Sequence, residues 1–313
     1  MRLLDIALDR LVLPGYSRIG YRIRARGWPP ADPWPGALRG KTAMVTGANS
    51  GLGMATARGL AALGASVIMV VRDRERGVAA AEAIAAEVPG ARLRVERCDL
   101  ADLPDVARFA ATGTGKLDVL VHNAGLLPVG RETTAQGHEL TLAVHVLGPL
   151  LLTESLRAPL AGGRLVLVSS AGMYTQPLHD EDPEYRTGSY RGAVAYARTK
   201  RMQAVLTAPL AERLSADRIS VYCTHPGWAD TPGVASSLPG FHRALRPLLR
   251  DPDQGADTAI WLAATDPAPE SGRFWHDRAR RPIDYRRGTR TSPDRARRFL
   301  DWCLAIVDNA RGR

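Results

Sequence analysis

Long hydrophobic runs are missing from this sequence of 313 residues. The longest apolar segment, residues 142–152, is interrupted by His145 and Pro149, whereas a membrane-spanning helix needs about 20 apolar residues. The first residues do not resemble a signal peptide either, because Asp5 and Asp9 interrupt their apolar pattern. We therefore expect no membrane-spanning helix in this sequence.

Cysteine is also scarce, with three in the whole chain. Cys98, Cys223 and Cys303 lie far apart and lack the spacing of metal ligands. The pattern is typical of buried thiols in a reducing compartment, so we expect a cytoplasmic protein without a metal site.

Lysine is the rarest cation, because only three of the 42 Lys and Arg residues are lysines. The net charge of +10 is also unevenly spread: residues 1–40 carry +4, residues 273–313 carry +7, and residues 41–272 carry −1. No basic stripe interleaved with aromatics crosses the centre, which argues against a nucleic-acid partner. The basic ends serve solubility, which we favour, or attract an anionic membrane surface as a peripheral contact.

From Lys41 onward, short β-branched runs alternate with helical patterns, which predicts an α/β doubly wound Rossmann fold. We expect a mostly parallel seven-stranded sheet with helices on both faces. The expected strands are residues 41–47, 66–72, 92–100, 117–125, 164–170, 219–227 and, more weakly, 272–275. The expected helices are residues 54–64, 78–88, 137–158, 196–214 (kinked or interrupted by Pro209) and 255–266.

Three parts follow from this pattern. Residues 1–40 form an amphipathic, basic arm with a Pro-rich linker, and residues 41–275 form the Rossmann domain with a substrate lid at about 228–252. Residues 276–313 form a basic tail, in which residues 293–310 are predicted to be an amphipathic helix.

A glycine-rich turn follows the first expected strand and opens the first helix of the domain. Gly47, Gly51 and Gly53 allow the backbone to turn tightly and to approach a pyrophosphate, whose charge favours a helix N-terminus. An ordinary β–α loop is the alternative, although the position between strand and helix favours a nucleotide. The cofactor residues expected here also include Asn49, Ser50 and Leu52.

Tyr196 and Lys200 are four residues apart on an expected helix and therefore project from one face. An ammonium near a phenol should lower the phenol's pKa from about 10 and so favour proton transfer by Tyr196. Ser170, at the end of a strand, could hydrogen-bond the reacting oxygen. Taken alone, a Tyr and a Lys on a solvated helix face would be the simpler explanation.

These motifs occur in an order that resembles the short-chain dehydrogenase/reductase family, and most closely its retinol-dehydrogenase-like branch. The resemblance rests on Thr46–Gly53, residues 122–125, Ser170, Tyr196 with Lys200, and residues 225–231, and it extends over about residues 41–275. It implies an oxidoreductase that interconverts a carbonyl and an alcohol by hydride transfer, with Tyr196 as general acid and base. The residues that it implies at the cofactor are Asp99 and Leu100 at the adenine, Asn123, Ala124 and Gly125 at the ribose, and Pro226, Gly227 and Thr231 at the nicotinamide.

The end of the second expected strand bears on the choice of cofactor. An NAD-binding Rossmann fold usually has an acid there, whereas this chain has Val71 followed by Arg72. Arg pairs well with a 2′-phosphate, so we expect NADP(H) in preference to NAD(H). A surface arginine is the alternative, and Asp73 complicates the interpretation.

Two departures from the family pattern stand out. His145 occupies the position of an Asn that, in the family, helps to hold a water relaying protons to the lysine; it could keep part of that hydrogen bonding or simply pack in the helix. The polar segment 177–192 lengthens the interval between Ser170 and Tyr196, either as a solvated insertion or as an active-site rim.

The lid contains apolar side chains and no acid-recognising clamp, which favours a hydrophobic carbonyl or alcohol substrate; the residues are Trp228, Leu238, Phe241 and Leu245. These side chains could equally pack only the lid. The N-terminal arm could lie on a membrane, on the enzyme body or on a partner subunit. A dimer contact through residues 293–310, and hence a homo-oligomer, also stays open.

Other functions fit the sequence less well. A nucleotide-sugar epimerase conflicts with the glycine spacing, and a methyltransferase has no need of Tyr196 with Lys200. A catalytically weakened NADP(H)-binding sensor or scaffold of the same fold is the main alternative, supported only by His145.

Overall fold

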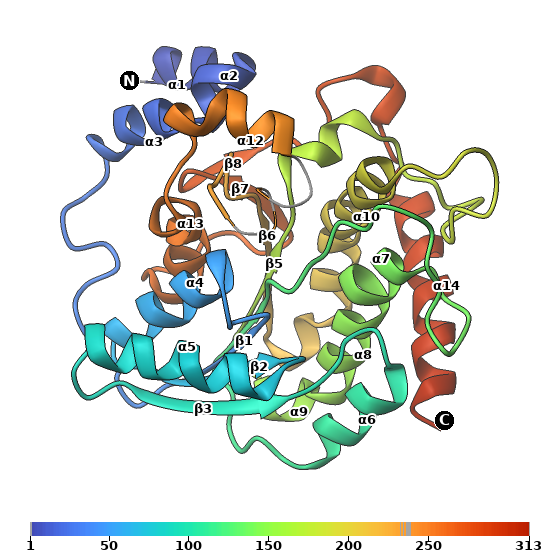
Figure 1. The fold of residues 1–313 in the computed structure, drawn as a ribbon, viewed down its shortest axis with the longest axis horizontal. Helices are drawn as coiled ribbons and strands as arrows, with labels where there is room; N and C mark the ends of the chain where they lie inside the picture. The colour runs from blue at the N-terminus through green and yellow to red at the C-terminus, as the bar shows by residue number, and fades with distance from the viewer. Residues whose placement is uncertain (1, 232, 234, 236–238, 313) are drawn as a thin grey trace.

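The computed structural model describes residues 2–231, 233, 235 and 239–312, and these surround one eight-stranded sheet (Figure 1). The strand order is β3-β2-β1-β4-β5-β6-β7-β8, and all neighbours are parallel except β7 and β8. The strands are β1 Thr42–Thr46, β2 Ser66–Val71, β3 Arg92–Arg97, β4 Val119–His122, β5 Arg164–Val168, β6 Ser220–Thr224, β7 Arg273–His276 and β8 Ala279–Arg281. The order reverses between β1 and β4, which confirms the doubly wound Rossmann fold.

The prediction of seven strands was wrong by one, because the sequence gives little sign of β8. A tight turn through Asp277 and Arg278 joins β7 to β8, and both residues have positive φ angles, 50° and 55°. Such two-residue hairpin turns usually contain Asn-Gly or Asp-Gly. Here the buried Asp277 carboxylate pairs with Arg24 and Arg250, and these contacts hold a turn that local sequence does not favour.

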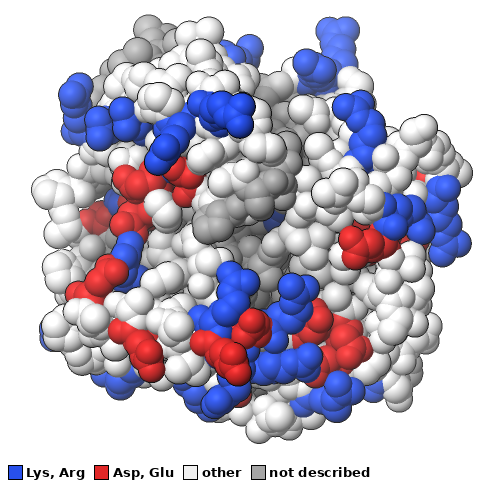
Figure 2. Space-filling view, viewed as in Figure 1, with Lys and Arg blue, Asp and Glu red and all other residues white. Residues whose placement is uncertain are grey.

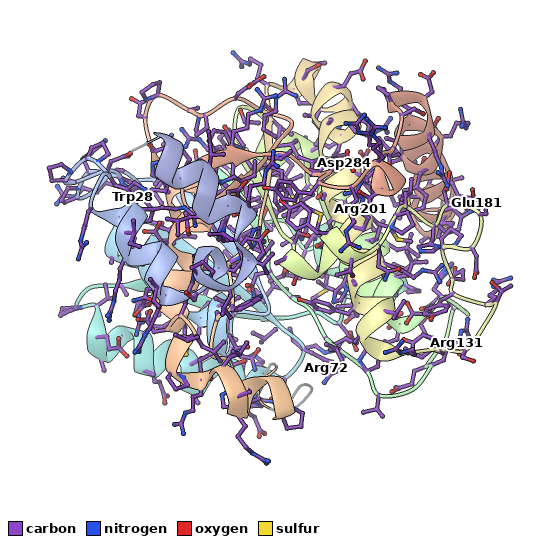
Figure 3. The ribbon with its side chains drawn as sticks, turned by 90° about the horizontal axis from the view of Figure 1, so that it is seen from above. Trp28, Arg72, Arg131, Glu181, Arg201 and Asp284 are labelled. Carbon is purple, nitrogen blue, oxygen red and sulfur yellow. The ribbon has the colours of Figure 1, made fainter. Side chains whose placement is uncertain are left out.

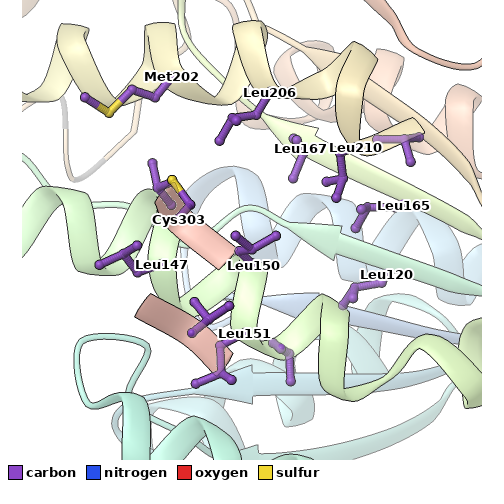
Figure 4. Packing of buried hydrophobic residues seen from close by; sticks show 14 of the residues in the cluster. Leu120, Leu147, Leu150, Leu151, Leu165, Leu167, Met202, Leu206, Leu210 and Cys303 are labelled. Carbon is purple, nitrogen blue, oxygen red and sulfur yellow. The ribbon is translucent and has the colours of Figure 1, made fainter. Parts of the chain in front are cut away.

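Helices cover both faces of the sheet, as predicted (Figure 1). On one face lie α4 Gly51–Ala62, α5 Arg74–Glu87 and α13 Pro252–Ala264. On the other lie α6 Leu103–Ala111, α7 Leu140–Leu142, α8 Gly148–Ser155, α9 Arg157–Leu160, α10 Gly192–Arg213 and α14 Pro293–Ala310. Figure 4 shows the leucine-rich packing on this second side, where Cys303 of α14 meets Leu147 and Leu150.

The single helix expected over residues 137–158 is divided. A π-helical turn, η1 Ala143–Leu147, separates α7 from α8, and Pro149 stands at the start of α8. Proline has no N–H, so Pro149 cannot donate to the carbonyl of His145 four residues earlier. Pro209, by contrast, does not interrupt α10, which continues to Arg213.

The two ends of the chain pack on the body. The arm forms α1 Arg2–Arg10, α2 Val12–Tyr16 and α3 Arg18–Ala25, which lie beside the lid helix α12 Pro239–Leu245 (Figure 1). At the other end, α14 packs against α8 and α10 and buries its apolar face there; the buried residues include Phe299, Leu300, Leu304 and Val307. This face of α14 is therefore buried within the chain.

Candidate functional site

The glycine-rich turn connects β1 to α4 at the carboxyl end of the strand. Gly47 and Gly51 have φ angles of 66° and 52°, which glycine adopts at little cost. A Cβ on Gly53 would lie 2.1 Å from the carbonyl oxygen of Gly47, so the turn is too tight for a side chain there. The side chain of Ser50, the N-cap residue, makes no capping hydrogen bond in the described structure. The first amides of α4 are thus available to an anion.

Residues 49–52 complete this turn in the place where they were predicted. Asn49, Ser50, Gly51 and Leu52 are all half-buried. Leu52 packs against the start of α13, because a Cβ on Gly255 would lie 2.5 Å from Leu52 Cδ2. The glycine-rich turn is therefore packed against α13.

The Asn123–Gly125 segment is hydrogen-bonded to the glycine-rich turn. Asn123 Nδ2 donates to the carbonyl oxygen of Thr46 (3.2 Å), and the amides of Asn123 and Ala124 donate to Thr46 Oγ1 (both 3.1 Å). Gly47 also faces Ala124, whose Cα would lie 2.8 Å from a Cβ on that glycine. These bonds bring together two motifs that lie more than 70 residues apart in the sequence.

Asp99 and Leu100 follow β3 at the same edge of the sheet. Asp99 Oδ1 accepts from the amide of Ala101 (2.9 Å), and its own amide donates to Asp105 Oδ2 (2.8 Å). Leu100 is buried, and its carbonyl oxygen lies 2.3 Å from an ideal Cβ on Gly148. The loop is therefore fixed by its own hydrogen bonds.

Arg72 follows the last residue of β2 and is exposed (Figure 3). The neighbouring Asp73 caps α5, because its carboxylate accepts from the amide of Arg76 (3.1 Å). In the described part of the chain Arg72 forms no ion pair. The carboxylate that complicated the cofactor prediction thus has a structural role, and the guanidinium is left for an anionic ligand.

Ser170, Tyr196 and Lys200 come together where β5 ends beside α10. Ser170 caps the 3₁₀ turn η2 Ala171–Thr175 and hydrogen-bonds the Tyr196 phenol. Lys200 Nζ lies 5.6 Å from the centre of the Tyr196 ring and donates to the carbonyl oxygen of Val168 (2.8 Å) and to Gln203 Oε1 (3.1 Å). The one shared helix face predicted from the spacing of Tyr196 and Lys200 is present.

The predicted effect of Lys200 on Tyr196 does not occur in this structure. Burial raises the pKa of the Tyr196 phenol, and the hydrogen bond with Ser170 opposes this rise only in part. Burial also lowers the pKa of Lys200 to about 8. Desolvation is therefore the main cause of both pKa shifts, with Lys200 buried and Tyr196 half-buried.

His145 is fully buried beside the two residues, with its ring in edge-on contact with Tyr196 (5.5 Å between centroids). The amide of Leu126 donates to His145 Nε2 (3.0 Å), so the ring proton is on Nδ1, which donates to Thr199 Oγ1 (2.8 Å). Burial holds the pKa of His145 well below its usual value. His145 is thus a neutral ring that fixes the loop after Gly125.

Gln203 is a site residue that the sequence reasoning missed. Its side chain is buried between Lys200 and the carbonyl oxygen of His145, to which Nε2 donates (2.8 Å). The available signal was its spacing, because residue 203 is three after Lys200 and therefore on the same face of α10.

Pro226, Gly227 and Thr231 lie in the loop after β6, and the N-terminal arm covers part of this loop. Gly227 has a φ angle of 72°, and a Cβ on it would lie 2.6 Å from the carbonyl oxygen of Tyr16. That carbonyl accepts from the amide of Trp228 (2.8 Å) and from Arg250 Nε (3.0 Å). The arm thus packs on the enzyme body, next to the residues predicted at the nicotinamide.

Only part of the predicted substrate lid falls among the described residues. Trp228 and Leu245 are half-buried, whereas Leu238 and the side chain of Phe241 lie outside the described residues. Figure 2 shows the surface hollowed below α12, with basic and acidic side chains on its lower rim.

The segment 177–192 is tightly anchored. The carboxylate of Glu184, which is buried, accepts from the amide of Glu139 (2.6 Å) and contacts His138 Nδ1 (2.8 Å). Tyr190 donates to Glu139 Oε1 (2.8 Å). Figure 3 shows Glu181 on the side of α14. Glu184 and Tyr190 therefore anchor the segment to residues 138 and 139, whereas residues 186–189 are exposed.

Comparison with known proteins assigns the family. The model of the short chain dehydrogenase family matches residues 41–240, and the chain belongs to that family. It is an oxidoreductase that acts on CH–OH or C=O groups. The predicted resemblance is confirmed.

Two relatives and one solved structure illustrate the similarity. "Dehydrogenase/reductase SDR family member 12" of Bos taurus is 38% identical over 274 residues, covering 85% of this chain and 86% of that protein. Retinol dehydrogenase 14 of Mus musculus is 36% identical over 266 residues, covering 78% and 79%. The crystal structure of a short chain dehydrogenase from Burkholderia cenocepacia J2315 in complex with NADP has a TM-score of 0.62 and 28% identity, over 76% of this chain and 96% of that one.

Proposed function

We propose that this protein is an NADP(H)-dependent oxidoreductase that interconverts a hydrophobic carbonyl compound and its alcohol, with Tyr196 as the general acid and base. The observation that carries the proposal is the cluster of Ser170, Tyr196 and Lys200 beside the glycine-rich turn. A bound nicotinamide cofactor supplies or accepts the hydride. The residues of this chain would bind it, orient the substrate and move one proton.

In the reductive direction, the Ser170 hydroxyl holds the carbonyl oxygen and the Tyr196 phenol donates its proton to that oxygen. The raised pKa of Tyr196 keeps the phenol protonated at neutral pH, as an acid requires. The Lys200 ammonium stabilises the phenolate that forms after proton transfer. In the oxidative direction the same groups act in reverse.

The cofactor residues proposed for this site fit a dinucleotide. The uncapped start of α4 and the tight turn at Gly53 suit a pyrophosphate, and the Asn123–Gly125 segment lies directly beside them. Arg72, free of an ion pair in the described structure, suits a 2′-phosphate. NADP and NADPH are bound in several related structures, which supports the same choice here.

Tyr196→Phe tests the proton-transfer role. We expect kcat for aldehyde reduction to fall by about 10²–10⁴-fold, because general acid catalysis contributes about that much, while NADPH binding changes little. The measurement is steady-state NADPH oxidation together with fluorescence titration of NADPH binding. Tyr190→Phe, in the segment 177–192, serves as the control and should retain activity.

Activity of Tyr196→Phe within a few-fold of the parent would contradict the assignment. NADPH binding without turnover of any carbonyl compound in the parent protein would instead favour the sensor or scaffold alternative. The parent protein is active in the first outcome and inactive in the second, so the same assay distinguishes them.

Arg72→Ser tests the cofactor preference. Loss of a charge-assisted contact with the 2′-phosphate should weaken NADPH binding by about 10- to 100-fold, and NADH binding should not weaken. The dissociation constants of both cofactors should be measured for this variant and for Arg94→Ser, which removes an exposed arginine from β3. Equal weakening of NADPH and NADH in Arg72→Ser would exclude a 2′-phosphate contact.

A series of straight-chain aldehydes tests the hydrophobic substrate. The half-buried Trp228, next to Gly227, and the half-buried Leu245 of α12 support an apolar pocket. Each methylene that becomes buried contributes about 0.8 kcal/mol, so kcat/KM should rise about fourfold per methylene until the pocket is filled. Aldehydes of equal length with a terminal carboxylate are the control. Reduction confined to small polar ketones would rule out this substrate class.

The N-terminal arm supports a peripheral membrane contact. It buries charged side chains and exposes aliphatic ones: Asp9 and Arg24 are buried, whereas the exposed set consists of Ile6, Leu11, Val12, Leu13 and Ile19. Arg24 is paired with Asp5 (2.7 Å) and Asp277 (2.7 Å). Leu8 and Tyr16 of the arm are buried, so the exposed aliphatic set is an additional apolar face, which supports an apolar partner.

Charge points to an anionic bilayer as that partner. Arg10, Arg18 and Arg22 lie among the exposed aliphatic residues and, in the described part of the chain, form no ion pair. Basic side chains gather over α3 and α12 (Figure 2). No helix of the described residues is long and apolar enough to span a membrane. The arm would therefore lie on the surface, at the cytoplasmic side that the three unpaired, buried thiols support.

Co-sedimentation with vesicles tests this contact. The full-length protein should bind vesicles that contain phosphatidylserine more strongly than neutral ones, and the double substitution Leu11→Ser, Leu13→Ser should reduce binding at least about tenfold. Val129→Ser is the matched control, because Val129 is 98% exposed and lies outside the arm. Failure of the parent to bind, together with a dimer that the double substitution dissociates, would assign the aliphatic face to a second copy of the chain.

A further inference from the structure

The side-chain amide of Gln203 connects the ammonium of Lys200 to the backbone of the π-helical turn. Gln203 Oε1 accepts from Lys200 Nζ (3.1 Å), and Nε2 donates to the carbonyl oxygen of His145 (2.8 Å). Both contacts are buried. The orientation of the amide is determined by its neighbours, because the opposite orientation would place donor against donor and acceptor against acceptor.

The carbonyl of His145 is available for this bond for a reason that lies in the sequence. Pro149, four residues later, has no N–H to donate to it. A buried carbonyl without a partner would be costly, and Gln203 Nε2 satisfies it. Gln203 therefore supplies, in the π-helical turn, the hydrogen bond that Pro149 cannot donate.

Among the described residues, the titratable groups that face Lys200 are neutral. The groups that face it are the Tyr196 phenol on α10, the neutral His145 ring on the π-helical turn and the Cys223 thiol on β6, whose pKa burial raises to about 12. Among the described residues no carboxylate forms an ion pair with Lys200. Its charge is supported by two oxygen acceptors, those of Val168 and Gln203.

We propose that Gln203 is a positioning residue that keeps the Lys200 side chain protonated and directed at Tyr196. The proposal rests on the proposed function of those two residues. Val168 and Gln203 each accept one of the three ammonium protons, which leaves one for the catalytic side. Removal of the Gln203 acceptor would leave a buried cation with one oxygen contact, and the neutral amine would then be favoured.

The scarcity of lysine makes this proposal directly measurable. With 13C-labelled lysine, NMR of the cofactor-free protein observes three side chains, and Lys41 and Lys116 are exposed references outside the site. The pKa of Lys200 is lowered to about 8 by burial. In Gln203→Met, which keeps the size of the side chain and removes its oxygen, the pKa should fall to about 7 or below.

The pH dependence of the enzyme's rate should change together with the pKa of Lys200. Lys200 is charged below its pKa, so activity that needs the ammonium is lost as the pH rises through that value. The alkaline limb of kcat/KM should therefore move to lower pH in Gln203→Met, by as much as the NMR titration moves. Gln203→Glu, which places a carboxylate against the ammonium, should shift both in the opposite direction and tests the proposal even if Gln203→Met folds poorly.

Thr207→Val provides the control for general damage to α10. Its hydroxyl donates to the backbone carbonyl of Gln203 (2.8 Å) and is buried, but it does not touch Lys200. Thr207→Val should lower stability without shifting the Lys200 titration or the alkaline limb of kcat/KM. An unchanged Lys200 titration in both folded Gln203 variants would overturn the proposal. A shifted Lys200 titration with an unchanged rate profile would support the role of Gln203 and contradict the catalytic role of Lys200.

Discussion

The ammonium of Lys200 lies in the interior, where the described residues offer it no carboxylate. A buried cation of this kind costs free energy unless oxygen acceptors are already in position, and much of the surrounding structure provides them. Val168 offers its carbonyl at the end of β5, and Gln203 offers its side chain one turn along α10. The π-helical turn fixes Gln203 in return. The site is thus arranged around a desolvated ammonium that donates hydrogen bonds to neutral oxygen acceptors.

Arg201, the residue after Lys200, shows why position 200 is a lysine in a chain that is otherwise rich in arginine. Arg201 is also fully buried, but its guanidinium binds the carbonyl of Ile283, Asp284 and the carbonyl of Thr289, and so holds the C-terminal segment to α10 (Figure 3). A planar fork with five donors suits that structural role. Near Tyr196 the compact ammonium needs fewer acceptors and has a pKa that its surroundings can adjust, which an arginine does not offer.

Much of the fold could be predicted from local patterns. Most of the parallel strands are continuous apolar runs, although β3 alternates charged and apolar residues, and helical patterns lie between them, so the Rossmann sheet and the helices on its two faces followed from the sequence. The glycine-rich turn, Ser170, Tyr196 and Lys200 were also placed correctly relative to strand and helix ends. What local pattern could not give is the effect of burial: the sign of the Tyr196 pKa shift depends on how many atoms enclose the phenol, and a spacing of four residues carries no such information. The hairpin at Asp277 and the docking of the arm depend on ion pairs between distant residues for the same reason.

The contacts of the arm also bear on when the site can form. Tyr16 and Gly15 hydrogen-bond Arg250, Arg24 pairs with Asp277, and Asp5 pairs with Arg281, so the partners are separated by 234 to 276 residues. Contacts of such range form late, because closing the chain between them costs entropy that only an assembled structure repays. During synthesis the arm emerges before its partners and cannot dock until they have been made. The loop at Gly227, part of the proposed cofactor site, is therefore expected to become fully ordered only after the arm has docked.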